Sequence, residues 1–91
     1  MSFDQTEFGN RLRERRKSLG ITQNELAITV GVTSEYISRL ERGIRTPSVD
    51  VVIALSKALS TTCNYLLTGE MDVQTEVMTI LYKALNDLKG S

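Results

Sequence analysis

Residues 22–42, TQNELAITVGVTSEYISRLER, decide the fold because they encode two short helices joined by a tight turn. Thr22 starts a capping box with the glutamate three residues later, which satisfies the first backbone amides of a helix. Gly31 supplies a left-handed turn without steric cost, and Thr33 or Ser34 can cap the second helix. Apolar residues at helical spacing give both helices a buried face. The stretch therefore predicts a helix-turn-helix.

The segments on either side of this motif also have helical periodicity. A helix is predicted from Gln5 to Leu19, with apolar residues gathered on one face. Three further helices are predicted by the same criterion, over Val49–Leu59, Cys63–Leu67 and Asp72–Lys89. No segment shows the alternation typical of strands. The sequence therefore predicts an all-α protein, with a five-helix domain that contains the helix-turn-helix at residues 1–69 and a C-terminal helix at residues 70–91.

The charges are balanced in number but not in position. Eleven basic and eleven acidic residues give a net charge of zero, which argues weakly against nucleic-acid binding. Between Asn10 and Arg45, however, eight basic residues face only four acidic ones, whereas the segment from Glu70 onward holds four acidic residues and two lysines. The basic half contains the helix-turn-helix, and this local excess matters more for nucleic-acid binding than the sum.

The sequence offers very little that points to catalysis. There is no histidine, the single cysteine has no base beside it in the sequence, and no glycine-rich phosphate loop or cluster of metal ligands appears. We therefore expect no enzyme activity, no metal and no cofactor. A lone cysteine excludes an internal disulfide. With no secretory signal and no apolar run of membrane-spanning length, the sequence predicts a cytoplasmic protein without a membrane partner.

The segment from Gln23 to Gly43 resembles the Cro/CI (XRE) family of bacterial and phage regulators, including the DNA-binding domains of lambdoid phage repressors. The resemblance continues through Arg45–Ser48 and Asn64–Gly69. Its combined spacing is specific and rests on Gln23, Ala27, Gly31, Ile37, Glu41, Gly43 and Pro47. It implies a transcriptional regulator, expected to be a homodimeric repressor of a palindromic double-stranded DNA operator. An antitoxin-like module with a protein partner, and secondary DNA binding, is the alternative.

In this family the second helix of the motif enters the major groove, with its N-terminal residues nearest the base edges. Arg39 is suited to a bidentate pair with guanine, and Glu35 can accept from a cytosine amine while repelling phosphate. The alternative is an ordinary solvated helix face, and the resemblance favours base contacts. The predicted base-contacting residues are Thr33, Ser34, Glu35, Ser38 and Arg39.

Contacts to the DNA backbone are expected from residues around this helix. Gln23 begins a helix, where an anion is favoured, and the resemblance implies that it touches phosphate or assists the recognition helix. For Arg42 and Arg45, a role in solubility is an equal alternative. The predicted phosphate contacts are Thr22, Gln23, Arg42, Arg45, Thr46 and Arg16. The other basic residues of the first helix are interpreted as a solvated face that adds long-range attraction: Arg11, Arg13, Arg15 and Lys17.

The resemblance further implies a partly buried ion pair between Arg16 and Glu41, joining the first helix to the recognition helix. Glu41 follows Leu40, so that without a partner its charge would lie near the core at high cost. Such a pair would orient the recognition helix.

The C-terminal helix carries a broader apolar face than an exposed helix needs. This face predicts either packing onto its own domain or a dimer interface, and a different protein could also bind it. We favour the dimer, because two half-sites about one DNA turn apart require two recognition helices. The predicted interface consists of Val73, Val77, Ile80, Leu81, Ala84, Leu85 and Leu88.

Overall fold

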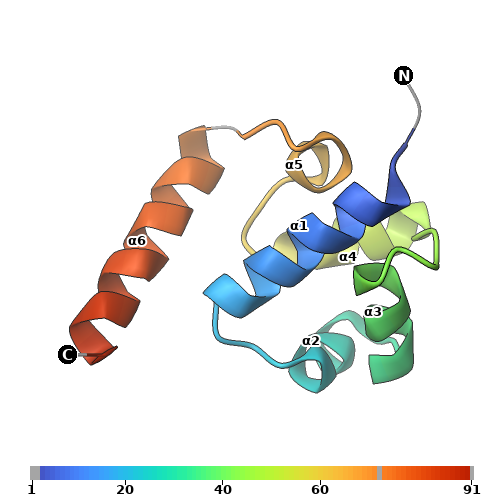
Figure 1. Ribbon diagram of the computed structural model, residues 1–91, viewed down its shortest axis with the longest axis horizontal. Helices are drawn as coiled ribbons and strands as arrows, with labels where there is room; N and C mark the ends of the chain where they lie inside the picture. Colours follow the sequence, from blue (N-terminus) through green and yellow to red (C-terminus); the bar gives the residue numbers. More distant parts are fainter. Residues whose placement is uncertain (1–2, 72, 91) are drawn as a thin grey trace.

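The computed structural model of the chain describes residues 3–71 and 73–90. Within these ranges it contains six α-helices and no strand, so the all-α prediction is confirmed. The helices are α1 (Gln5–Ser18), α2 (Gln23–Val30), α3 (Ser34–Glu41), α4 (Val49–Ala58), α5 (Cys63–Thr68) and α6 (Val73–Gly90). Helices α1–α5 form one body, and α6 extends beside it (Figure 1). The predicted helix start at Asp72 and the side chain of Val73 lie outside the described residues.

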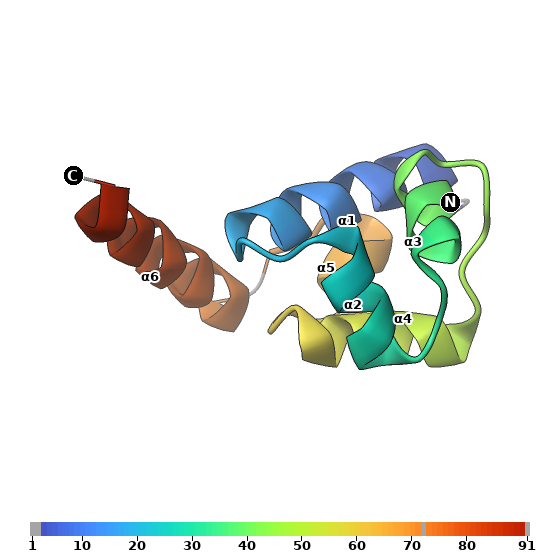
Figure 2. The same ribbon diagram turned by 90° about the horizontal axis from the view of Figure 1, so that it is seen from below.

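The first five helices surround a single apolar core. Figure 2 shows α1 along one side and α4 along the other, with α2, α3 and α5 between them. Each fully buried leucine, isoleucine or phenylalanine contributes about 1.5–3 kcal/mol to the free energy of unfolding. The core residues are Phe8, Leu12, Leu26, Ala27, Ile37, Leu40, Val52, Leu55, Leu59 and Leu66. These are the apolar residues at helical spacing, which is why the sequence could predict the fold.

Arg11 and Arg15, expected on a solvated face of the first helix, bind the ends of other helices instead, and the prediction is wrong for both. Arg11 donates to the carbonyl oxygens of Leu66 at 2.9 Å and Leu67 at 3.0 Å, near the end of α5. The last carbonyls of a helix have no partner within it, and one guanidinium can satisfy two of them. The remaining members of the predicted face are exposed: Arg13 and Lys17.

Arg15 does the same for α4. Its side chain is buried, and it donates to the carbonyl oxygens of Leu59 at 2.8 Å and Ser60 at 3.0 Å. Desolvation by burial lowers the pKa of Arg15 from its ordinary value. The charge lies at the C-terminal end of α4, where the helix dipole favours a cation. Arg15 also donates to the hydroxyl of Thr79 at 2.7 Å, which joins α6 to α1.

Helix α6 contacts α1 of the body through side-chain hydrogen bonds. Thr79 receives the bond from Arg15, and the Asn86 amide donates to the carbonyl of Ser18 at 3.3 Å. The apolar residues predicted for an interface are exposed wherever their side chains are described: Val77, Ile80, Leu81, Ala84, Leu85 and Leu88. None of the helices in the described part of the chain has both the length and the apolar character needed to cross a bilayer.

Candidate nucleic-acid interface

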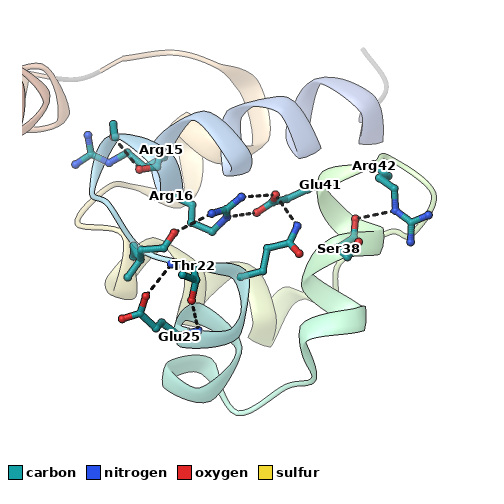
Figure 3. A network of polar contacts seen from close by, with 10 residues as sticks. Arg15, Arg16, Thr22, Glu25, Ser38, Glu41 and Arg42 are labelled. Carbon is teal, nitrogen blue, oxygen red and sulfur yellow. Dashed lines mark hydrogen bonds and ion pairs between the residues drawn. The ribbon is translucent and has the colours of Figure 1, made fainter.

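The helix-turn-helix forms through the local signals that the sequence contains. Both bonds of the capping box are present: the Glu25 amide donates to the Thr22 hydroxyl at 3.0 Å, and the Thr22 amide donates to the Glu25 carboxylate at 2.9 Å (Figure 3). Gly31 ends α2 with a φ of 77°, in the left-handed region. Thr33 caps α3 by accepting from the Tyr36 amide at 3.0 Å. The predicted caps and turn are therefore confirmed.

Helix α3 is held against α1 by buried side chains and by one very close backbone approach. Ile37 and Leu40 are fully buried. Gly9 of α1 faces the end of α3, where a Cβ atom on Gly9 would lie 2.4 Å from the Leu40 carbonyl oxygen and 2.7 Å from that of Glu41. Only glycine permits this approach. The contacts turn the opposite face of α3 outward.

The five predicted base-contacting residues share that outward face. Thr33, Ser34, Glu35 and Arg39 are exposed, and Ser38 is half-buried. The Ser34 hydroxyl donates to the side-chain oxygen of Asn24 at 3.0 Å, which links the N-terminal turns of the two motif helices. Asn24 was missed by the sequence reasoning, although its place one residue after the start of α2 puts a polar group beside Ser34.

Arg16 and Glu41 form the ion pair that the resemblance implied. Arg16 donates to both carboxylate oxygens of Glu41, at 2.6 Å and 3.0 Å, and to the carbonyl of Ile21 at 2.8 Å. The side chains are 10% and 3% exposed, so the pair is nearly withdrawn from water. The side-chain amide of Gln23 donates to the same carboxylate at 3.1 Å. Figure 3 shows how this network joins α1, α2 and α3.

A cavity of about 310 Å³ opens beside this network. It is lined by Arg13, Arg16, Gln23, Ser38, Glu41 and Arg42. Three guanidinium groups and the first turn of α2 meet here, which favours an anion such as phosphate. The sequence reasoning assigned Arg13 to a solvated face. Its position three residues before Arg16 puts both on one side of α1, and that spacing could have identified it.

The exposed face of α3 carries a second charged group, which extends from its first turn to its C-terminal cap. The Glu35 carboxylate accepts from Arg39 at 2.9 Å and from Arg42 at 3.5 Å. The hydrogen bond from Arg39 is the largest of the effects that lower the pKa of Glu35. Arg42 also donates to the carbonyl of Ser38 at 3.4 Å. Two predicted base contacts and one predicted phosphate contact are thus joined to each other in the free protein.

The loop after α3 positions the last two predicted phosphate contacts. The guanidinium of Arg45 lies 5.5 Å from the centre of the Tyr36 ring, within the range of a cation–π contact. The hydroxyl of Thr46 donates to the side-chain oxygen of Gln5. Both residues are exposed. In the described ranges no group of three or more acidic, cysteine or histidine side chains is arranged to hold a metal ion.

Known proteins that are similar to this chain also contain a helix-turn-helix. A family profile described as helix-turn-helix matches residues 12–66. The repressor protein C2 of Salmonella phage P22 is 41% identical over 83 residues, which are 91% of this chain and 37% of that protein. This chain thus spans little more than a third of that relative.

Two solved structures superpose on most of the chain. The P22 c2 repressor, in complex with a synthetic operator, gives a TM-score of 0.68 at 44% identity and covers 69% of this chain and 96% of its own. The restriction-modification controller protein C.AhdI from Aeromonas hydrophila gives a TM-score of 0.68 at 36% identity, over 70% of this chain and 97% of its own.

Proposed function

The chain belongs to the helix-turn-helix family of the Cro/CI (XRE) type, and on this premise we propose that it is a sequence-specific regulator of transcription. It binds a palindromic double-stranded DNA operator as a homodimer and represses by occupying a promoter. The observation that carries the proposal is the polar outer face of α3 beside a cavity lined by Arg13, Arg16 and Arg42. The polar face of α3 suits contacts to base edges, and the arginine-lined cavity suits a phosphate group.

In the proposed complex the two features have different tasks. The outer face of α3 lies in the major groove and contacts bases through Thr33, Ser34, Glu35, Ser38 and Arg39. Phosphates of the DNA backbone are contacted by Thr22, Gln23, Arg42, Arg45, Thr46 and Arg16. The cavity adds Arg13 to this set. The ion pair between Arg16 and Glu41 fixes the orientation of α3 relative to α1. Selection from a pool of random duplexes tests the function: enrichment of a two-fold symmetric motif is expected, and no enrichment would contradict it.

Arg39→Ala is expected to weaken binding to the selected operator by about 1–3 kcal/mol and to relax the preference at one base pair of each half-site. Binding to random duplex of the same length should change much less. Titrations of both duplexes at one salt concentration measure the two effects. Lys17→Ala removes an exposed charge on α1 outside the cavity and is the matched control. An equal loss of affinity on both duplexes would mean that Arg39 contacts phosphate only.

The proposed dimer uses the apolar face of α6. With about 100° between successive residues of a helix, Thr79 and Asn86, which contact the body, lie on one side of α6. The exposed apolar residues from Val77 to Leu88 are centred roughly 180° away from that side. The apolar face therefore remains exposed although α6 is attached to the body, which supports a dimer over packing onto its own domain. In this proposal residues 1–69 bind DNA and residues 70–91 form the interface.

Leu81→Glu is expected to weaken the dimer at least tenfold, because it places two carboxylates in an apolar interface. Leu81 is 50% exposed in the single chain, so the fold of each copy should be unaffected. Light scattering after size-exclusion chromatography, across a range of concentrations, measures the dissociation. Lys83→Glu, on another side of α6, is the control and should leave the dimer intact. A wild-type monomer would instead favour the antitoxin-like alternative, in which α6 binds a different protein.

The proposed activity consists of binding alone. It includes no catalytic step, no metal and no cofactor, and it takes place in the cytoplasm. Control of the operator then depends on the concentration of the protein, on its dimerisation or on a protein partner.

A further inference from the structure

Glu35 lies in the first turn of α3 and contacts two arginines farther along the helix. Arg39 and Arg42 follow it by four and seven residues, so all three side chains lie on one side of the helix. Both contacts go to the same carboxylate oxygen: Nε of Arg39 at 2.9 Å and a terminal guanidinium nitrogen of Arg42 at 3.5 Å. One carboxylate thus holds the residue expected to contact guanine and a residue expected to contact phosphate.

The stability of the fold does not explain this arrangement. The three side chains are 63%, 52% and 56% exposed for Glu35, Arg39 and Arg42. Ion pairs this exposed contribute little to the free energy of unfolding, since water screens them and the long side chains lose conformational freedom. A negative charge on a surface that meets DNA also lowers affinity for phosphate. A role in choosing among DNA sequences accounts for both observations.

The geometry of the Arg39 contact indicates how such a choice works. A guanidinium makes its bidentate pair with guanine through two N–H groups of one edge. The Glu35 carboxylate accepts from Nε of Arg39, so this contact leaves the edge formed by the two terminal nitrogens available for a base. Glu35 therefore restricts the rotamers of Arg39 before DNA arrives. A side chain that is already ordered in the free protein loses less conformational entropy when it binds DNA.

We propose that Glu35 is a specificity-determining residue that acts through Arg39 and Arg42, beyond any base contact of its own. It orients Arg39 towards the base edges, and its charge offsets the attraction of both arginines for phosphate. Random DNA, which is bound mainly through its phosphates, is then bound less tightly. On the operator, the contact between Arg39 and guanine compensates for the repulsion. This inference rests on the proposed function, because it requires a DNA sequence that Arg39 prefers.

Glu35→Gln removes the charge and keeps the shape of the side chain. We expect binding to random duplex to tighten about fivefold, as for one unit charge close to phosphates. The slope of log K against log salt should steepen by up to about 0.9, the value for one additional phosphate neutralised. The ratio of operator affinity to random-duplex affinity should fall about fivefold. Glu14→Gln makes the same charge change at an exposed position of α1 and should leave the ratio unaltered.

A double variant separates action through the arginine from a direct base contact. In an Arg39→Ala background, Glu35→Gln should lose most of its effect on the affinity ratio, whereas a direct contact to a base would keep its effect. An unchanged ratio in the single variant, or a loss confined to one base pair and independent of Arg39, would overturn the inference while leaving the proposed function in place. If the wild-type protein selects no sequence, both are overturned.

Discussion

Glu41→Ala is expected to lower the free energy of unfolding by about 3–5 kcal/mol, the cost of leaving one member of a buried ion pair without its partner. Arg16 is 10% exposed in its side chain and donates two hydrogen bonds to this carboxylate. The Gln23 amide would lose its acceptor as well. Since small domains have about 5–15 kcal/mol in total, the variant should be close to unfolding at 37 °C. Urea denaturation followed by circular dichroism measures the change.

The matched control removes both charges at once. The double variant Arg16→Met with Glu41→Leu should regain stability to within about 1 kcal/mol of the wild type, because no charge is left buried. Its affinity for operator DNA should be lower than that of the wild type, since Arg16 also lines the basic cavity. Recovery of stability without recovery of binding would separate the two roles of the network. A loss below about 1 kcal/mol of unfolding free energy for Glu41→Ala alone would contradict the stabilising role of the ion pair.

Gly9→Ala is the second change with a large expected effect, a loss of about 3 kcal/mol of unfolding free energy. The added methyl group would meet two backbone carbonyl oxygens of α3, at 2.4 Å and 2.7 Å, and backbone cannot turn aside as a side chain can. Alanine is the better helix former by about 1 kcal/mol, so a gain would be expected if the contact were absent. Thermal denaturation should therefore show a loss, and operator affinity should fall because α3 is displaced.

Asn10→Ala serves as the control for this substitution. It makes a similar change in helix propensity at the next residue of α1, where the side chain is exposed. A small gain, about 0.5 kcal/mol, is expected there. If Gly9→Ala also stabilised the protein, the close approach of α1 and α3 would be wrong.

The parts of the fold that the sequence predicted are those with local causes. The capping box at Thr22, the turn at Gly31 and the cap at Thr33 each depend on residues within a few positions of one another. The core followed from apolar residues at helical spacing. The pair between Arg16 and Glu41 spans 25 positions and came from the family resemblance, because nothing in the local pattern requires it.

What the sequence did not predict are contacts whose partner is a backbone carbonyl in a distant helix. Arg11 and Arg15 alternate with Arg13 and Lys17 along one basic segment, and charge alone gives all four the same solvated interpretation. Their different roles depend on where α4 and α5 end in space. The same applies to the joining of Glu35 to its two arginines: helical spacing permits it, but the choice of rotamer decides it.

Arginine side chains of α1 hold three other helices in place, so we expect these helices to open together. Three arginines on this helix bind elements that are far away in sequence: Arg11 binds the end of α5, Arg15 the end of α4, and Arg16 the carboxylate on α3. Detaching α1 therefore releases three other helices together, so they have little opportunity to fray singly. Amide hydrogen exchange in α3, α4 and α5 should then report one common opening free energy, equal to that of global unfolding.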